Sequence, residues 1–540
     1  MDSQRSFLVI ALIVVSFLLF QQWQLDYNQP QQSESQISVD QIMDTPTDNQ
    51  SDVPLGDSQP VVETRSERKM VTVKTDVLEL TIDTLGGDIV SAKLPTYPTE
   101  QNGDIPFTLL ETTQGFNYVA QSGLVGRDGP DATKKPIYSV EKEEFILEGE
   151  SLEVPFTFIN NQGLSVTKRF VFKPGHFDVK VMHEVQNTSD SVKQVVLYGQ
   201  LKQSTNNSAE GSMIMPTYRG AAYSTHDERY EKYDFDDIAD ANLKKTTQGG
   251  WVAMLQHYFV AAWVPAADQQ NKLFTRLFKG NQAIIGFKSS DPIDIQAGET
   301  KTLSASLFVG PKDQDAMKSL SDTLDLTVDY GFLWWLSQPL FALLTMIQGV
   351  VVNWGLAIIV ITIIVKSLLY PLTKAQYVSM AKLKKLQPKM QQLKERYGDD
   401  RQRMSQAMME LYRKEKVNPA GGCLPLLLQM PIFLALYWVF LESVELRHAA
   451  FGLWINDLSA PDPFYILPIL MGASMYLMQK LQPTAMTDPM QQKIMQLMPV
   501  FMTVFFLMFP SGLVLYWLVS NLISIAQMVY INKSIEKAAE

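Results

Sequence analysis

The sequence predicts a membrane protein with a large antiparallel β-sandwich domain, and three observations support this fold class. Six apolar segments occur in the 540-residue chain, one near its start and five after residue 350. Between them, residues 71–310 alternate apolar and polar side chains with period two, the pattern of strands that bury one face. Residues 374–416 hold 12 Lys and Arg but only 5 Asp and Glu, although the whole chain has a net charge of −11. These features indicate a helical membrane core, an outer sandwich and a basic cytoplasmic segment.

The first apolar segment, residues 7–20, is short for a membrane span, which needs about 20 residues. A cleaved signal peptide is the alternative, but no small-x-small cleavage motif follows Phe20. We therefore predict an uncleaved signal anchor over residues 1–23. Residues 24–69 are rich in Gln, Ser, Asp, Thr and Pro, with no Lys or Arg before Arg65, and are expected to form a disordered periplasmic tether.

The polar domain, residues 70–330, is predicted to be a sandwich of antiparallel strands, with inward-facing runs such as Leu78, Leu80 and Ile82. Cys423 is the chain's one cysteine, so no intramolecular disulfide can stabilise the domain. Its histidines lack the spacing of a zinc site, and the chain has no phosphate-binding glycine-rich motif. We therefore expect a structural or binding role for this domain, no catalysis, and neither a cofactor nor a metal.

The rest of the chain is divided by its apolar and basic segments and oriented by the positive-inside rule. Residues 331–370 would form a helix of about 60 Å, twice a hydrocarbon core, so we expect a break at Pro339 or Gln348-Gly349. The predicted segments are an interfacial amphipathic helix anchored by Trp334 and Trp335 at 331–348, the second span 349–371, a basic cytoplasmic helical hairpin 372–420, the third span 421–442, a periplasmic loop 443–463, the fourth span 464–480, a cytoplasmic loop 481–493, the fifth span 494–510, the sixth span 512–531 and a cytoplasmic tail 532–540.

The hairpin is expected to contain two amphipathic helices that break at Tyr397-Gly398, after which Asp399-Asp400 can cap the second. Its methionines are expected mainly to pack the two helices together, with an adaptable surface for apolar partners as the alternative. These methionines are Met390, Met404, Met408 and Met409.

Lys366 is the most informative residue of the membrane core, because a charge within a span costs about 2.5–3.5 kcal/mol near the bilayer centre. Thr362 lies one helical turn before it, Tyr516 and Ser520 share one face of the last span, and Gln429 lies in the third span. These residues can line a polar, water-accessible cavity. Alternatively, Lys366 extends its ammonium to the lipid headgroups and the hydroxyls pack helices together.

Several motifs, taken in order, are similar to those of a known family. They are Asn418-Pro419-Ala420-Gly421-Gly422-Cys423-Leu424-Pro425, then Phe451-Gly452-Leu453-Trp454-Ile455-Asn456-Asp457-Leu458-Ser459-Ala460-Pro461-Asp462-Pro463, then Phe509-Pro510-Ser511-Gly512-Leu513. Together with the basic hairpin after the second span, they resemble the YidC family of membrane protein insertases, which has mitochondrial and chloroplast relatives. The resemblance covers the whole chain, in the Gram-negative form with a periplasmic sandwich.

This resemblance implies a bacterial inner membrane protein that inserts and folds other integral membrane proteins. The family works alone on short-tailed clients or together with the Sec translocon, and without nucleotide hydrolysis. Its six spans comprise an amino-terminal anchor and a five-helix insertase core. The implied partners are nascent membrane proteins, the Sec translocon, lipid and, through the cytoplasmic loops, the ribosome, but no nucleic acid.

The resemblance also implies a hydrophilic groove for the client within the five-helix core. Lys366 stands where the family usually has arginine, so the charge is kept but the bidentate recognition of a carboxylate is lost. Thr362 and Tyr516 match positions that contact the entering segment, and we add Gln429 and Ser520 to this predicted substrate groove.

Two other function classes remain as alternatives at this point. A secondary transporter with an intramembrane cation site would have interrupted spans in two similar halves, and the sequence shows no such repeat. An anchored periplasmic carbohydrate-binding protein would leave the five later spans without a purpose.

Overall fold

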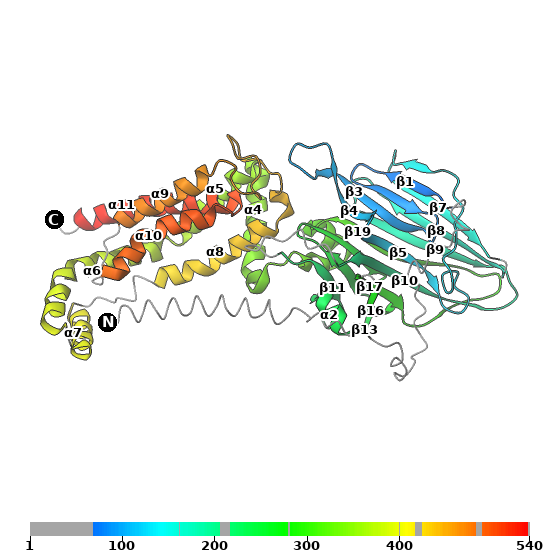
Figure 1. Ribbon diagram of the computed structural model, residues 1–540, viewed down its shortest axis with the longest axis horizontal. Helices are drawn as coiled ribbons and strands as arrows, with labels where there is room; N and C mark the ends of the chain where they lie inside the picture. Colours follow the sequence, from blue (N-terminus) through cyan, green and yellow to red (C-terminus); the bar gives the residue numbers. More distant parts are fainter. Residues whose placement is uncertain are drawn as a thin grey trace. The chain divides into compact units, whose positions relative to one another are not determined.

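The computed structural model describes residues 68–160, 162–205, 217–278, 281–398, 400–415, 424–481 and 489–537. The chain forms two units, which we call the β unit and the helical unit. The β unit contains residues 52–346 and 434–460, and the helical unit contains residues 1–51, 347–433 and 461–540 (Figure 1). The predicted signal anchor, nearly all of the predicted tether and residues 418–423 of the first family motif lie outside the described residues.

Two sheets build the β unit, as the period-two pattern predicts, and consecutive strands in the order of each sheet are hydrogen-bonded neighbours. The first sheet contains β13 (Lys244–Gln248), β16 (Gln270–Phe278), β17 (Gln282–Ser289), β10 (Lys193–Ser204), β5 (Phe116–Val125), β4 (Pro106–Thr113), β3 (Asp88–Pro98), β2 (Glu79–Asp83), β1 (Met70–Lys74) and β6 (Glu144–Ile146), with β18 (Ile293–Ile295) on β10. The second sheet contains β12 (Glu231–Tyr233), β11 (Gly220–Ser224), β14 (Trp251–Leu255), β15 (Phe259–Pro265), β19 (Thr300–Pro311), β9 (Asp178–Asn187), β8 (Leu164–Phe172) and β7 (Leu152–Ile159).

The pairings between these strands are antiparallel except for the parallel pair β1–β6. The β unit also contains short helices, which are α2 (Phe235–Asp240), α3 (Gln314–Leu320), and the 3₁₀ turns η1 (Leu324–Thr327), η2 (Gly331–Leu333) and η4 (Val444–Leu446). Two longer helices, α4 (Trp334–Val351) and α8 (Leu424–Glu442), each contribute residues to both units.

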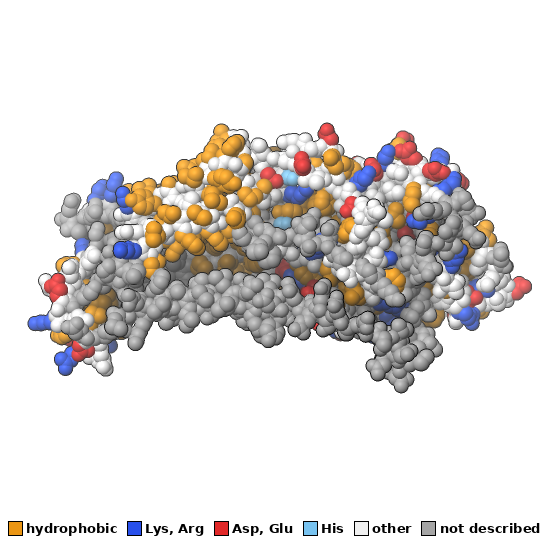
Figure 2. All heavy atoms as spheres, viewed as in Figure 1, with side chains coloured by type: hydrophobic (Ala, Val, Ile, Leu, Met, Phe, Trp, Pro, Cys, Tyr) orange, Lys and Arg blue, Asp and Glu red, His pale blue; other side chains and the backbone are white. Residues whose placement is uncertain are grey.

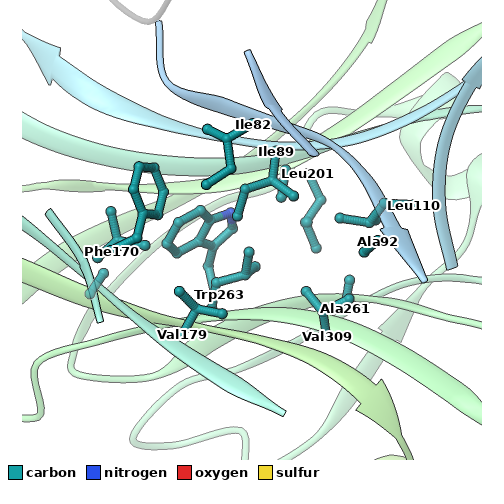
Figure 3. Packing of buried hydrophobic residues seen from close by; sticks show 14 of the residues in the cluster. Ile82, Ile89, Ala92, Leu110, Phe170, Val179, Leu201, Ala261, Trp263 and Val309 are labelled. Carbon is teal, nitrogen blue, oxygen red and sulfur yellow. The ribbon is translucent and has the colours of Figure 1, made fainter. Parts of the chain in front are cut away.

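The hydrophobic core lies between the two sheets. It is filled by the side chains that point inward from the strands of both sheets. Ile82 and Leu201 of the first sheet lie opposite Phe170 and Trp263 of the second (Figure 3). The Trp263 indole N–H donates to the carbonyl of Gln200 at 3.1 Å, so the largest core side chain also satisfies its one donor. In a chain with one cysteine, packing of this kind must supply the stability.

Lys168 is a fully buried cation on the core side of β8, in register with Val166 and Phe170. Its ammonium donates to the carbonyls of Gly86, Gly87 and Ser122 at 3.0, 2.9 and 2.7 Å. Burial lowers the pKa of Lys168 from 10.5 to about 8. Gly87 has φ +61°, and a Cβ there would lie 2.9 Å from the lysine side chain, so this turn requires glycine.

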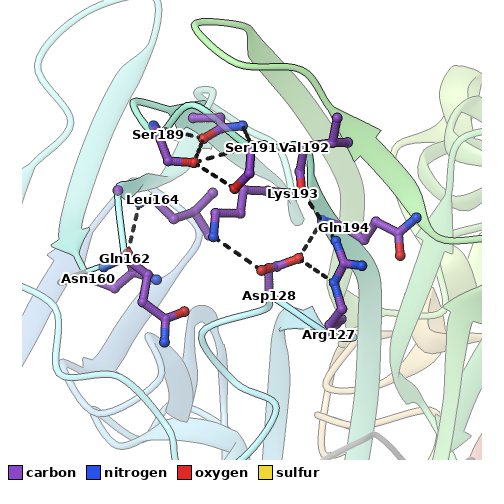
Figure 4. Close-up of polar contacts among 12 residues, drawn as sticks. Arg127, Asp128, Asn160, Gln162, Leu164, Ser189, Ser191, Val192, Lys193 and Gln194 are labelled. Atoms are coloured by element: carbon purple, nitrogen blue, oxygen red, sulfur yellow. Dashed lines mark hydrogen bonds and ion pairs between the residues drawn. The ribbon is translucent and has the colours of Figure 1, made fainter.

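A polar network joins the ends of β5, β9 and β10 (Figure 4). One carboxylate oxygen of Asp128 accepts from the Gln194 backbone N–H at 2.9 Å and from the Arg127 guanidinium at 3.1 Å. Its other oxygen lies 3.3 Å from the Lys193 ammonium. The Asn187 amide donates to the Ser191 carbonyl at 2.8 Å. These bonds fix the turns that set the register of the three strands.

The segment between α8 and residue 460 packs within the β unit. The Arg447 guanidinium donates to the Pro98 carbonyl at 2.8 Å and lies 5.4 Å from the Phe259 ring centre and 5.8 Å from that of Phe107. The His257 imidazole lies 2.9 Å from the Leu441 carbonyl. The sequence predicts a periplasmic loop for this segment, and the sandwich holds it through backbone and cation–π contacts.

The described helices of the helical unit, besides parts of α4 and α8, are α5 (Trp354–Leu368), α6 (Tyr370–Tyr397), α7 (Arg401–Lys414), α9 (Ile466–Leu481), α10 (Pro489–Phe506) and α11 (Ser511–Lys537). The α6–α7 break lies where the sequence predicts it, since α6 ends before Gly398 and the Asp400 carboxylate caps α7 by accepting from the Arg403 N–H. Met390 and Met408 pack between these two helices, whereas Met409 is exposed.

The predicted break between residues 331 and 370 is wrong in position. Helix α4 continues through both Pro339 and Gln348-Gly349, and the chain turns instead at Val352, which has φ +56°. The Asn353 side chain then accepts from the Leu356 N–H and starts α5. An asparagine cap therefore decides the helix start, while the proline is accommodated within the helix.

By length and composition, two helical segments in the described ranges are long and apolar enough to cross a membrane, residues 331–351 and 511–535. Helix α5 and the first half of α6 qualify as a third if they count as one span, although they meet at a bend of 62°. Shorter apolar helices cover Gln429–Glu442, Ile466–Leu481 and Lys493–Phe506. The first of the two long segments contains the stretch predicted to lie in the interface.

Candidate functional site

The candidate site is a polar seam between α5 and α11 in the helical unit. Lys366 of α5 has only 6% of its surface exposed, and its ammonium donates to the Ser524 hydroxyl of α11 at 2.8 Å. The Gln527 amide of α11 donates to the Lys366 carbonyl at 3.3 Å. The cation therefore points across to the neighbouring helix α11.

Hydroxyl and amide groups continue the seam along α11 and reach α9. The Ser524 hydroxyl donates to the Ser520 carbonyl at 2.8 Å, and the Asn521 amide donates to the Ser474 hydroxyl of α9 at 3.0 Å. Asn521 and Ser524 are buried together with Ser474 and Ser520. Helix α11 thus carries polar groups towards both α5 and α9, as expected where polar side chains of spans face the bundle interior.

Thr362 is also buried on α5, one turn before Lys366. Its hydroxyl donates to the Ile358 carbonyl of its own helix at 2.5 Å. This backbone bond satisfies the donor of the hydroxyl but leaves its oxygen able to accept a further hydrogen bond.

An aromatic cluster links α8, α10 and α11 beside the seam. The centre of the Phe433 ring of α8 lies 6.2 Å from that of Tyr516 and 4.6 Å from that of Trp517, both on α11. The Phe506 ring of α10 also packs against Trp517, with 4.8 Å between the ring centres. Tyr516 is 2% exposed, so its ring is enclosed by this cluster.

Four of the five predicted groove residues are therefore buried around α5 and α11. Gln429 is half-buried on α8, one helical turn before Phe433, the residue that packs against Tyr516. Ser524 lies four residues after Ser520 and so continues the face of the last span that Tyr516 and Ser520 share, and Ser474 is not among the predicted residues at all. The polar side chain of Ser474 inside an apolar segment was the signal from which it could have been predicted.

The outer faces of α9 and α10 are apolar and exposed. Figure 2 shows hydrophobic side chains gathered over this part of the helical unit. On α10, the exposed fractions of Leu497, Val500, Phe501 and Val504 lie between 60% and 65%. A continuous apolar surface of this kind fits the acyl chains of a bilayer. In the described part of the chain, no group of three or more His, Cys, Asp or Glu side chains is arranged to hold a metal ion.

Comparison with known proteins relates this architecture to one family. Residues 70–343 match the model of the YidC periplasmic domain, and residues 346–538 match that of the 60Kd inner membrane protein. The membrane protein insertases YidC of Pseudoalteromonas atlantica and Shewanella pealeana are each 56% identical to this chain, with 99% of both chains covered in each case.

Among solved structures, the chain is similar to a crystal structure of an active YidC insertase with its first transmembrane domain resolved. The TM-score is 0.38 at 20% identity, with 85% of this chain and 92% of that chain covered. The two family models and the full-length relatives agree with the sequence motifs. The chain therefore belongs to the YidC family of bacterial inner membrane proteins with a periplasmic domain, whose curated relatives are membrane protein insertases.

Proposed function

We propose that this chain is a membrane protein insertase and chaperone that moves short polar tails of its clients across the bilayer through the seam between α5 and α11. The observation that supports this route is the buried Lys366 ammonium, held by the Ser524 hydroxyl at 2.8 Å. The chain lacks a phosphate-binding glycine-rich motif, in keeping with insertion without nucleotide hydrolysis.

The driving force in this proposal is the partition of the client's apolar segment into lipid. Twenty apolar residues at roughly −0.3 to −0.6 kcal/mol each contribute about −6 to −12 kcal/mol. One acidic residue that crosses with the tail costs about 2.5–3.5 kcal/mol, so a short tail leaves the balance favourable. A long or highly charged tail reverses it, and such clients need the Sec translocon.

Within the seam, a client carboxylate replaces the Ser524 hydroxyl as the partner of Lys366. The Lys366 ammonium has three donors, of which Ser524 takes one. Hydroxyl and amide groups of Thr362, Ser520 and Asn521 then replace part of the water that the tail loses. Since these side chains are buried, the tail reaches them only when a neighbouring helix moves aside.

The aromatic cluster of Phe433, Phe506, Tyr516 and Trp517 marks the side on which we expect this movement. It joins α8 to α10 and α11 through ring contacts, which separate without breaking a backbone hydrogen bond. A client span leaving between α8 and α10 would pass from these rings to the exposed apolar face of α10. Gln429 on α8 would meet the client at the edge of this route.

We further propose six spans for the chain: the amino-terminal anchor, α5, α8, α9, α10 and α11. The apolar lengths of α11 and of the bent α5–α6 pair support this arrangement, and the three shorter apolar helices complete it. In this arrangement α6 and α7 form the cytoplasmic hairpin and meet clients first, and α4 lies in the periplasmic interface. Exposed Trp334 and Trp335 fit the interfacial position. The Sec translocon, the ribosome and lipid are the further partners that this proposal includes.

Reconstitution of the pure protein in liposomes tests the proposal most directly. A small client with a single span and a short tail is added, and protection of the translocated tail from external protease is scored. We expect protection that depends on the protein and needs no ATP. Protection equal to that in protein-free liposomes would refute the insertase activity. Protection that is abolished without ATP would refute partition as the driving force.

A further inference from the structure

A groove of about 540 Å³ lies on the β unit, on the face of the first sheet that points away from the hydrophobic core. Strands β1 to β5 and β10 contribute its walls and floor. Its volume lies within the range of about 300–1,000 Å³ that small-molecule sites occupy. None of the residues that line the groove belongs to the seam of the helical unit. A function of this groove would therefore be separate from the proposed insertion route.

Its floor contains the buried side chains of Gln121 and Asp88, which belong to one hydrogen-bonded chain with Gln200, a residue outside the lining. The Gln200 amide donates to the Gln121 carbonyl oxygen at 2.9 Å, and the Gln121 amide donates to one carboxylate oxygen of Asp88 at 2.7 Å. The Lys135 ammonium pairs with that same oxygen. Gln200, Gln121 and Asp88 are only 1%, 5% and 6% exposed. The other oxygen of Asp88 has no hydrogen-bond partner among the described residues.

Stability alone does not call for such a floor. Burying amides and a carboxylate costs free energy unless every polar atom is paired, and a solvent-facing strand surface can leave those groups in water instead. Asp88, however, keeps an unpaired acceptor beside a cavity in the part of the chain that the structure describes. A preorganised chain of donors and acceptors with one unpaired acceptor is an arrangement that can orient a polar ligand.

The backbone around the groove excludes one class of ligand. Strand β5 is paired with β10 on one side and β4 on the other, and β3 is paired with both β2 and β4. A peptide that binds by adding a strand needs a free sheet edge with unpaired backbone groups. This groove lies in the middle of the sheet, so a ligand meets side chains.

The charges around the groove disfavour another class of ligand, the anions. Three of the four cations that line the groove are paired with carboxylates: Arg68 with Asp83, Lys93 with Glu79 and Lys135 with Asp88. The fourth, Lys202, is only 3% exposed, and its ammonium lies 5.8 Å from the centre of the Phe278 ring. An anion such as phosphate would therefore find little accessible unbalanced positive charge. The other wall residues are mostly hydroxyls and amides, which both donate and accept; they include Thr81, Ser91, Thr108, Thr112 and Asn117.

We propose that this groove binds a neutral saccharide of two to a few units. Each sugar hydroxyl both donates and accepts, which matches the mixed character of the walls and the chain of amides in the floor. The unpaired Asp88 oxygen is buried, and it would accept from a sugar hydroxyl once the Lys135 side chain, which pairs with the same carboxylate, turns outward.

Binding is tested with the full-length chain in lipid nanodiscs, because the headgroups of glycoside detergents would themselves compete. Maltose, cellobiose and diacetylchitobiose are titrated as probes by calorimetry and by saturation-transfer NMR. We expect saturable binding of at least one probe with a Kd below about 1 mM. No saturation by any of the three would overturn the proposal.

Three variants locate the binding. Gln121→Leu breaks the floor chain, and Ser91→Trp fills the groove from a partly exposed wall position that does not disturb the core. Each is expected to weaken binding at least tenfold. Gln194→Leu is the matched control, because that glutamine pairs with Asp294 outside the groove. The affinity of this variant for the saccharide should equal that of the unmodified chain. Full binding by the Ser91→Trp variant, or an equal loss in the control, would refute the assignment even if Gln121→Leu fails to fold.

Discussion

Replacing Lys366 by leucine isolates the charge of the seam from its packing. The side chain is 6% exposed on α5, and its single described hydrogen bond runs to Ser524 at 2.8 Å. Leucine keeps most of the buried apolar contact of the lysine stem and removes the ammonium. The change is therefore expected to affect clients whose tails carry a carboxylate and to spare clients whose tails are neutral.

The size of the effect follows from two opposing terms. A client carboxylate about 4 Å from the ammonium gains roughly 4 kcal/mol at an effective dielectric constant of about 20. Displacing the hydrogen bond between Ser524 and the charged lysine costs about 1.5–3 kcal/mol. The net stabilisation of the crossing tail is then about 1–2.5 kcal/mol, which corresponds to a rate lowered about 5- to 70-fold in the leucine variant.

The assay compares four initial insertion rates in liposomes. Two clients differ by one Asp→Asn change in the tail, and each is inserted by the unmodified chain and by Lys366→Leu. With Lys366→Leu, the insertion rate of the Asp client is expected to fall about 5- to 70-fold. The insertion rate of the Asn client is expected to fall less than twofold. Lys366→Arg should behave as the unmodified chain because it keeps the charge, and Lys366→Glu should fall below Lys366→Leu for the Asp client. Equal losses for both clients would refute charge attraction and leave a packing role.

Three further predictions concern the β unit and are measured on the purified full-length chain, as the thermal unfolding temperature and, for Arg447, also as protection from protease. Lys168→Met should destabilise the folded chain by about 2–4 kcal/mol, because three buried carbonyls lose their donor. Replacement of the exposed Lys180 by Met is the control and should leave the unfolding temperature unchanged. Equal unfolding temperatures for the two variants would contradict the role of the buried ammonium. Burial raises the pKa of Glu445 from 4.5 to about 7, with nearby acidic side chains adding to the shift, so the folded state holds this proton more tightly than the unfolded state. Stability should therefore fall as pH rises from about 4.5 to 7, and Glu445→Gln should raise the unfolding temperature more at pH 8 than at pH 5; the same gain at both values would dismiss the shift. Arg447→Leu should cost about 2–3 kcal/mol through its lost Pro98 bond and ring contacts and should expose residues 443–460 to protease, with Arg447→Lys intermediate; unchanged protection would contradict this.

Local signals in the sequence were sufficient for part of the secondary structure. Alternation with period two predicts strands such as β2, β7, β9 and β19, and the hairpin break follows from Gly398 and the Asp400 cap. These predictions succeed because the side-chain period and the capping chemistry depend on residues within one or two turns. The break before α5 is misplaced because a proline and a glycine suggest it too early, whereas the Asn353 cap decides where the helix starts.

The core face of β8 shows where a local pattern was informative but incomplete. Leu164, Val166, Phe170 and Phe172 face the core with period two, and Lys168 occupies the middle of that series. The pattern therefore places the lysine in the core. It does not show that the carbonyls of a turn around Gly86 and of β5 converge there to bind the ammonium.

The sequence by itself determined the division of the chain into a strand-rich part and a part with apolar helices, the family motifs and the presence of a cation inside an apolar segment. Only the tertiary structure decided what that cation touches, since the partner of Lys366 lies 158 residues away on another helix. It likewise brought Gln121 to Asp88 in the floor of the groove, and Gln200 to Gln121 beside it. Such contacts depend on how helices rotate against one another and on how strands align in register, and no run of neighbouring residues specifies either quantity.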